Sequence, residues 1–258
     1  MKSPLNYLGE KSRLAERIAG MLPKDHVCYC EPFCGAAWIL FRKNPSKSEV
    51  INDQDGELVT FWRVVQNHLE EFLRYYKFVI ISRKVFELEN KKRPETLTDV
   101  QRAVRYFYLQ KNGFGGKTHG RTFEISVTSG PRLNLSNIEE KLLEVHWRLS
   151  NVIIEHLDAC ECIARYDRPE TLFYLDPPYY GTPGYAVPFE HNDYVRVRLA
   201  LDKIKGRFLL SLNDCKEVRQ IFKGFSIKKI STTYSAANGL SDNANRSEPR
   251  HELLIKNF

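Results

Sequence analysis

The stretch Leu172-Phe173-Tyr174-Leu175-Asp176-Pro177-Pro178-Tyr179 joins a short apolar run to a turn that two prolines stiffen. The apolar run predicts a buried strand, so that Asp176 follows its carboxyl end, the edge where open α/β sheets bind ligands. The Asp176 carboxylate and the Pro177 carbonyl can accept hydrogen bonds from an amino group, and the Tyr179 ring can stack on a flat base. The stretch predicts a site for an adenine or cytosine amino group, although Asp-Pro is also an ordinary turn starter.

Six further runs rich in β-forming residues accompany this one along the chain. Helical patterns lie between most of the seven runs, which favours an α/β fold with a mostly parallel, seven-stranded sheet covered on both faces. The other six runs are residues 27–29, 50–51, 152–154, 208–212, 227–231 and 253–255.

A helical region interrupts this alternation. Apolar residues at three- and four-residue spacing predict helices over 57–76 and 98–109 and a third from Ser136, where Glu139 completes a capping box. We therefore expect one domain formed by residues 1–56 and 150–258, with an inserted helical domain, residues 57–149. Residues 111–121 hold four glycines and four potentially cationic side chains, which predicts a mobile basic loop, either a linker or a ligand-binding surface.

The overall composition narrows the class of protein. The formal charge of +7 and the pI near 9.0 favour a polyanionic partner. The sequence contains no apolar run of about 18 residues and no signal-peptide core at its start, so we expect a cytoplasmic protein without membrane contact. The six cysteines lack the CxxC spacing of zinc sites, and we expect them to be reduced thiols.

Acidic residues follow four successive predicted strands. Small residues in 31–37 allow a ligand to approach the backbone after the first strand, and Asp53 after the second is placed to hold ribose hydroxyls. Asp158 and Asp176 follow the third and fourth strands. Together these acids predict a nucleoside site along one sheet edge, although each acid alone could simply cap a helix. Lys11 at a helix start opposes the helix dipole, which suggests an anionic ligand there or a solvated lysine.

Four motifs occur in an order that resembles one family: residues 7–11 (YLGEK), 31–35 (EPFCG), 52–53 (ND) and 176–179 (DPPY). They are similar to those of Dam-type DNA adenine-N6 methyltransferases, the D12 class, and the similarity continues through 211–214 and 252–255. The resemblance implies a Rossmann-like methyltransferase fold, S-adenosyl-L-methionine as cofactor, double-stranded DNA as partner and no requirement for a metal. It also implies transfer of a methyl group to the N6 amino group of a flipped-out adenine.

The resemblance also assigns roles to residues. Asp176, Pro177 and Tyr179 would hold the target base, Lys11 would lie near the methionine end of the cofactor, and Asp158 would bind its adenine amino group. The positions matched to cofactor binding are Tyr7, Lys11, Phe33, Gly35, Asp53, Asp158 and Asp176. The resemblance implies that residues 1–56 and 150–258 form the catalytic methyltransferase domain and that residues 57–149 form the target-recognition domain. Within the latter, residues 108–121 resemble the target-recognition region. Its DNA-binding candidates, with one from further along the insertion, are Lys111, Asn112, Phe114, Lys117, His119, Arg121 and Arg132.

The chain departs from the family pattern at Glu10, at Ala36-Ala37 and at Gly115-Gly116. The last difference lies in the recognition region, so GATC is not assumed as the target. Two alternatives stay open: methylation of cytosine N4 or of RNA adenine, and a catalytically silent DNA-binding module. Asp at position 176, rather than Ser, favours adenine by resemblance. Intact Lys11 and Asp53 argue against a silent module, because a pure binder needs no ribose clamp.

Overall fold

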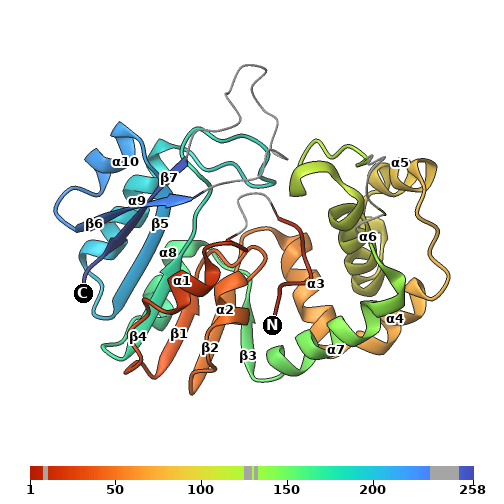
Figure 1. Cartoon of the computed structure of the whole chain (residues 1–258), viewed down its shortest axis with the longest axis horizontal. Helices are drawn as coiled ribbons and strands as arrows, with labels where there is room; N and C mark the ends of the chain where they lie inside the picture. Colours follow the sequence, from red (N-terminus) through yellow and green to blue (C-terminus); the bar gives the residue numbers. More distant parts are fainter. Residues whose placement is uncertain (8–10, 125–129, 131–132, 233–249) are drawn as a thin grey trace.

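The computed structural model describes residues 1–7, 11–124, 130, 133–232 and 250–258. Within these residues seven strands form one sheet in the order β3-β2-β1-β4-β5-β7-β6 (Figure 1). Strands β1 to β5 pair in parallel, and β7 is antiparallel to both of its neighbours. The strands are β1 (Cys28–Glu31), β2 (Ser48–Asn52), β3 (Val152–Glu155), β4 (Thr171–Leu175), β5 (Arg207–Asn213), β6 (Ser226–Thr232) and β7 (Arg250–Lys256).

The strand order creates a switch point beside the central strand. The chain runs outward from β1 through β2 to β3 and then returns to place β4 on the other side of β1. Ligands of open α/β sheets bind beyond the carboxyl ends of the strands at such a point. All seven β-rich runs of the sequence fall within these strands or overlap them, and the predicted α/β class is confirmed.

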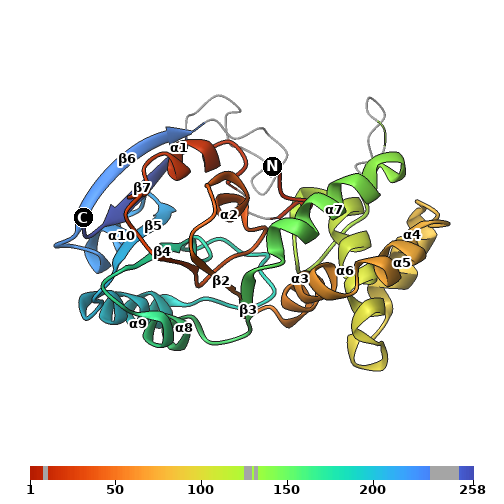
Figure 2. The ribbon, with the colours of Figure 1, turned by 90° about the horizontal axis from the view of Figure 1, so that it is seen from below.

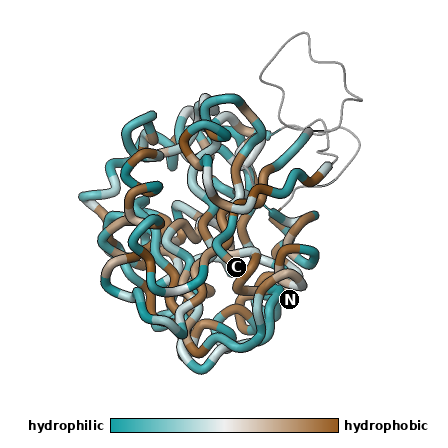
Figure 3. Tube along the Cα trace, turned by 90° about the vertical axis from the view of Figure 1, so that its left-hand side faces the viewer, coloured by the Kyte–Doolittle hydropathy of each residue, from teal (hydrophilic) through white to brown (hydrophobic). Residues whose placement is uncertain are grey.

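Helices cover both faces of the sheet, as the view from below shows (Figure 2). One face packs against α1 (Ala15–Ala19) and α2 (Trp38–Arg42), and the other against α8 (Ala159–Tyr166), α9 (His191–Asp202) and α10 (Lys216–Ile221). Side chains alternate between the two cores, so Tyr174 points into the first core and Phe173 into the second. The hydropathy colouring of Figure 3 shows apolar and polar stretches alternating along the chain in the same way.

A group of helices lies beside the β3 edge of the sheet (Figure 1). It contains α3 (Gly56–Asn67), α4 (Leu69–Tyr76), α5 (Arg83–Lys91), α6 (Asp99–Asn112) and α7 (Ile138–Leu149). Its centre is aromatic: the Phe61 and Phe107 rings are stacked with centroids 5.4 Å apart, and Phe72 meets Phe107 edge to face at 5.7 Å. Trp62 and Tyr29 belong to the same buried cluster, so this core continues into the sheet.

Two details of the predicted helices are wrong. The single helix predicted over 57–76 is two helices separated at His68, whose φ of −137° is not helical. The apolar spacing did not reveal the break, because it continues unchanged across one residue. The capping box at Ser136 and Glu139 is absent: Ser136 lies in a 3-10 turn, where its backbone N–H donates to Asn134 Oδ1 at 3.0 Å. Asn137 takes the N-cap position of α7 without a side-chain bond.

Candidate active site

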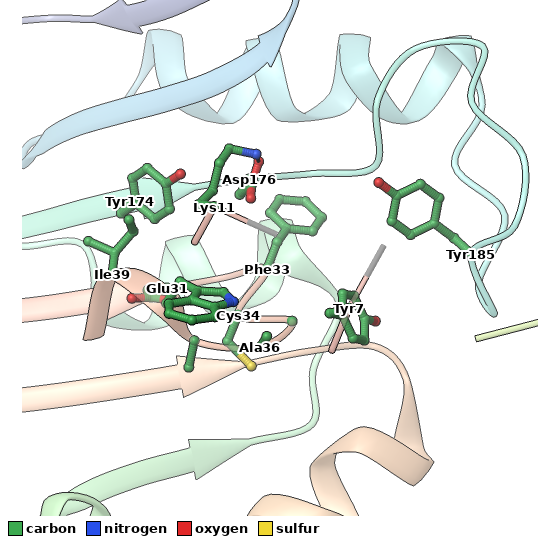
Figure 4. A pocket seen from close by; sticks show the side chains of 13 residues that line it. Tyr7, Lys11, Glu31, Phe33, Cys34, Ala36, Ile39, Tyr174, Asp176 and Tyr185 are labelled. Carbon is green, nitrogen blue, oxygen red and sulfur yellow. Dashed lines mark hydrogen bonds and ion pairs between the residues drawn. The ribbon is translucent and has the colours of Figure 1, made fainter. Parts of the chain in front are cut away.

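Acidic residues gather at the carboxyl edge of β3, β2, β1 and β4, because these four neighbouring strands are parallel. Asp53 and Asp176 line one cavity of about 540 Å³ together with Tyr7, Phe33 and Gly35. An adjoining cavity of about 440 Å³ shares Tyr7, Phe33, Gly35 and Asp176 and adds Lys11, Glu31 and Tyr174 (Figure 4).

Asp176 is at the centre of a hydrogen-bond network. Lys11 Nζ lies 2.6 Å from Asp176 Oδ1, and Ser211 Oγ donates to the same oxygen at 2.9 Å. Lys11 Nζ also donates to the Tyr179 hydroxyl at 2.8 Å, and the Tyr174 hydroxyl lies 3.0 Å from Ser211 Oγ. Lys11 is only 3% exposed, so its charge is held at the carboxylate by burial.

Burial raises the pKa of Asp176 above the usual value for an aspartate. The ammonium of Lys11 and the hydrogen bond from Ser211 act in the opposite direction without cancelling the effect of burial. A positive charge that develops next to this carboxylate would therefore be stabilised strongly, because little water screens it.

The backbone after Asp176 is held from two other elements. Asn213, at the end of β5, accepts from Tyr180 N at 2.9 Å and donates to Tyr180 O at 3.1 Å. The Tyr194 hydroxyl of α9 donates to Pro178 O at 2.7 Å. No sequence pattern had predicted a role for Ser211, Asn213 or Tyr194. A usable signal existed for Ser211 and Asn213, which are polar residues at the end of an otherwise apolar strand.

A buried asparagine joins two loops to the end of β2. Asn52 Nδ2 donates to Pro32 O at 2.9 Å and Leu157 O at 3.1 Å, and Asn52 Oδ1 accepts from Leu157 N at 2.8 Å. These bonds tie the loops after β1 and β3 to the end of β2. The base of the cavity is therefore fixed before any ligand binds.

Asp53 is held by backbone groups. Its two oxygens accept from Gly35 N at 2.9 Å and from Asp55 N at 3.0 Å. Burial raises the pKa of Asp53 to about 6, and the neighbouring Asp55 carboxylate adds to the rise, although the backbone hydrogen bonds oppose it. Gly35 has a φ of +46°, and a Cβ there would lie 3.2 Å from the Tyr7 ring. Glycine is therefore required for the tight turn after β1 and for the close approach of Tyr7.

Asp158 has a structural role in the fold. Its carboxylate caps α8 by accepting from Cys160 N at 3.0 Å and Glu161 N at 3.4 Å, and it pairs with Arg196 at 3.0 Å. Among the described residues, the first cavity is lined by Ala159 next to it and not by Asp158 itself. Its assignment to the cofactor adenine stays a prediction.

The predicted basic loop, residues 111–121, makes more contacts with the rest of the protein than its composition suggested. Asn112 is buried and donates to Tyr108 O at 2.9 Å, and Gly116 is buried against the Tyr7 backbone, where a Cβ would come within 2.8 Å of it. These contacts tie part of residues 111–121 to the rest of the protein, because glycines allow close backbone approach as well as conformational freedom. Phe114 is 37% exposed.

The remaining DNA-binding candidates differ in whether their side chains already bond to oxygen atoms of the protein. Lys111 Nζ donates to Asn6 Oδ1 at 3.3 Å, and Arg121 Nε donates to Gln110 Oε1 at 3.1 Å and to Lys117 O at 3.2 Å. The exposed His119 and the half-buried Lys117 lie in the same segment. Arg132 lies outside the described residues, and the structure does not test it.

The described residues also bear on three expectations from composition. All six cysteines are free thiols, as expected. No group of histidine, cysteine or acidic side chains that could hold a metal occurs in the part of the chain that the structure covers. None of the helices described here combines the length and the apolar character that a membrane crossing requires.

The family model of the D12 class N6 adenine-specific DNA methyltransferases matches residues 7–236 of the chain. The chain belongs to this family. It is thus an adenine-specific DNA methyltransferase, and the resemblance seen in the four sequence motifs is confirmed. DNA is its substrate.

Several known proteins are similar to this chain, to different degrees. The chain is 24% identical to the Type II methyltransferase M1.LlaDCHI of Lactococcus lactis subsp. cremoris over 98% of this chain and 94% of that protein. An uncharacterized protein of Methanocaldococcus jannaschii, MJECS07, is 31% identical over 86 residues, which cover 33% of this chain and 20% of that one. A precorrin 8w decarboxylase from Methanobacterium thermoautotrophicum aligns over 99% of this chain and 95% of its own with a TM-score of 0.41 and 12% identity.

Methyltransferases of this kind generally take the methyl group from S-adenosylmethionine, and the cavity of this D12-family enzyme suits that cofactor. Burial raises the pKa values of Glu31, Asp53 and Asp176, and all three acids line the two adjoining cavities. A cationic sulfonium and ammonium would relieve the cost of burying these carboxylates. The small side chains of the turn after β1 leave room for the ligand.

Proposed function

We propose that this enzyme transfers the methyl group of S-adenosylmethionine to the N6 amino group of an adenine flipped out of a specific duplex DNA sequence. Asp176 and the Pro177 carbonyl would accept hydrogen bonds from N6, and the Tyr179 ring would stack on the base. The observation that carries the proposal is that Asp53 and Asp176 line one cavity. An acid suited to a ribose and an acid suited to a target amino group thus face the same space.

Both described donors to the Asp176 carboxylate contact the same oxygen, Oδ1. We therefore assign the other oxygen, Oδ2, as the acceptor for the adenine amino group. The second hydrogen of N6 would reach the Pro177 carbonyl, whose position Tyr194 and Asn213 fix through the neighbouring peptide groups. Two acceptors at fixed positions orient the nitrogen lone pair toward the cofactor side of the cavity.

The chemistry depends on where charge develops. The N6 lone pair is delocalised into the ring, so hydrogen bonds that favour a pyramidal nitrogen make it a better nucleophile. As the nitrogen is methylated it becomes positive, and the half-buried Asp176 carboxylate stabilises that charge. The same carboxylate lies within reach of the proton that N6 loses afterwards. When bound, S-adenosylmethionine supplies an already activated methyl group, so the protein residues need to position and stabilise rather than activate it.

On the cofactor side, the proposed contacts follow the lining of the cavities. Asp53 would accept from ribose hydroxyls, and Tyr7, Phe33 and Gly35 would border the nucleoside. Lys11 lines the adjoining cavity, where it would meet the carboxylate of the methionine end. Extruding the base from the duplex costs a few kcal/mol, which binding to the flanking DNA must offset. We assign that binding to the inserted region, residues 57–149.

The decisive experiment is methyl transfer by an Asp176→Ala variant. Labelled cofactor and duplex oligonucleotides give the rate, and chromatography of the digested product distinguishes N6-methyladenine from N4-methylcytosine. Loss of the acceptor should abolish transfer while DNA binding is largely retained. Asp25→Ala is the matched control, because Asp25 is an exposed aspartate that pairs only with Arg207 among the described residues. Near-normal turnover by Asp176→Ala would refute the assignment.

A further inference from the structure

Residues 73–85 carry four basic side chains and no acidic one. All four are exposed, and three of them, Lys77, Arg83 and Lys84, lie at the end of α4 and at the start of α5. None of the three has an ion-pair partner among the described residues. We refer to Lys77, Arg83 and Lys84 as the basic face. Uncompensated cations grouped in this way attract a polyanion.

The basic face is fixed to the recognition region rather than isolated from it. The Tyr108 hydroxyl of α6 donates to Ile80 O at 3.0 Å and accepts from Ser82 N at 3.2 Å, which anchors the connection between α4 and α5. The Arg83 guanidinium lies 5.6 Å from the centroid of the Phe123 ring, and Phe86 meets Phe123 edge to face at 5.5 Å. The start of α5 therefore packs directly on the segment that ends the predicted recognition region.

The same segment continues to the catalytic loop. Thr118 N and Thr118 Oγ1 both donate to Gly184 O at 3.3 Å, which joins residues 113–124 to the loop that begins at Asp176. In Figure 1, α5, this segment and the catalytic loop lie in a row along the upper edge of the molecule. A duplex whose target base enters the catalytic cavity would extend along this row toward the basic face.

Cations nearer the cavity are less able to serve the flanking DNA. The side chains of Lys111 and Arg121 donate to oxygen atoms of the protein itself, as described above. Beside the basic face, by contrast, Phe78 is 84% exposed and Ile80 is 68% exposed. Apolar side chains among cations that lack an ion-pair partner in the described residues suit a surface that contacts both the phosphates and the edges of DNA grooves.

We propose that Lys77, Arg83 and Lys84 form a second DNA-contact surface that binds phosphates of the duplex flanking the target adenine. This inference rests on the proposed function, because it takes the duplex to be seated with the target base at Asp176. The contacts are independent of base identity, so they add affinity and register but no sequence preference.

The test compares two double variants that make the same change in charge. Arg83→Ala/Lys84→Ala removes two cations of the basic face. Lys203→Ala/Lys205→Ala is the control, since both lysines are exposed and precede β5. They therefore lie at the amino ends of the parallel strands, whereas the site lies at the carboxyl ends. Dissociation constants for a duplex carrying the target sequence and for an unrelated duplex are measured over a series of salt concentrations. Methyl transfer is measured at saturating DNA.

Each lost phosphate contact lowers the slope of log K against log salt by about 0.9, which corresponds to roughly eightfold in affinity at about 0.1 M salt. The basic-face variant should therefore lose about sixtyfold on both duplexes and about 1.8 in slope, with kcat nearly unchanged. The control should behave as wild type. Equal slopes for the basic-face variant and wild type would overturn the proposal, even if methyl transfer to adenine proceeds normally.

The alternative occupant of this surface is a second copy of the chain. Sedimentation of wild type and Phe78→Ser distinguishes it: a dimer that the substitution dissociates, combined with unchanged DNA affinity, would also overturn the proposal. Failure of the proposed function itself has a different signature, namely that wild type transfers no methyl group to adenine in DNA.

Discussion

Replacing Glu31 with glutamine is expected to stabilise this enzyme at neutral pH. Glu31 ends β1, is 1% exposed and accepts from the Tyr29 hydroxyl at 2.7 Å and from Leu40 N at 2.8 Å, both at Oε1. Burial raises its pKa from 4.5 to about 8, although these hydrogen bonds oppose the rise. A glutamine side-chain oxygen can accept the same two hydrogen bonds without carrying a charge.

The direction in which the free energy of unfolding changes with pH follows from the number of protons that each state binds. Between pH 4.5 and about 8 the folded state holds a proton on Glu31 that the unfolded state has lost, so the free energy of unfolding falls as pH rises through this window. At pH 7 the cost is about 3 kcal/mol, taking 1.36 kcal/mol per pH unit from the unfolded pKa. Glutamine removes that cost. For a chain of this size the gain corresponds to an increase in Tm of about 6 to 12 °C.

The assay is thermal unfolding of wild type and Glu31→Gln at pH 4.5 and at pH 7.5. The difference in Tm should be large at the higher pH and nearly vanish at the lower one. Glu49→Gln is the opposite control: burial raises the pKa of Glu49, but Arg148 and Lys43 more than offset this and hold it below the usual value, so its neutralisation should destabilise. A Glu31→Gln difference that is the same at both pH values, or of the wrong sign at pH 7.5, would show that Glu31 is ionised in the folded protein.

Two further predictions concern the catalytic edge. Because the Lys11 ammonium lowers the pKa of Asp176, Lys11→Met should shift the acid limb of the kcat profile to higher pH at saturating cofactor; an unmoved limb would mean that Asp176 is not the group that titrates. Asn213→Ala removes both hydrogen bonds to the Tyr180 backbone and should lower kcat by about tenfold to a hundredfold, since small displacements of catalytic groups have effects of that size. Asn213→Asp keeps the acceptor and should fall between; a change in DNA affinity alone, with kcat intact, would assign Asn213 elsewhere.

The sheet could be predicted because the pattern that identifies each strand lies within a few neighbouring residues. Apolar runs such as 172–175 are short, bounded by turns and interspersed with helical patterns, and parallel pairing then places their polar ends together. The acids of the site could be found for the same reason, since Asp53 and Asp176 follow strands directly. Their roles on the two sides of the cavity stay predictions.

The contacts that could not be predicted from the sequence join residues that are distant along the chain. The contact between Asp176 and Ser211 spans 35 residues, and Tyr194 reaches Pro178 from α9, a helix whose sequence is only weakly amphipathic. The polar, glycine-rich composition of 111–121 predicted exposure, yet Gly116 is buried because the Tyr7 backbone lies against it. Composition describes what a segment can do alone, whereas burial is decided by what packs on it.

The two bonds from Thr118 to Gly184 O have a consequence for how this enzyme can change. They connect the segment that we propose to face the bases around the target to the loop that we propose to hold the target base. Under this proposal, new base preferences can arise by exchanging exposed side chains such as that of His119, whose backbone N–H also donates to Gly184 O at 3.4 Å. Insertions or deletions between Asn112 and Thr118 would instead displace the loop that begins at Asp176. Changes of length there should therefore lower turnover before they alter specificity.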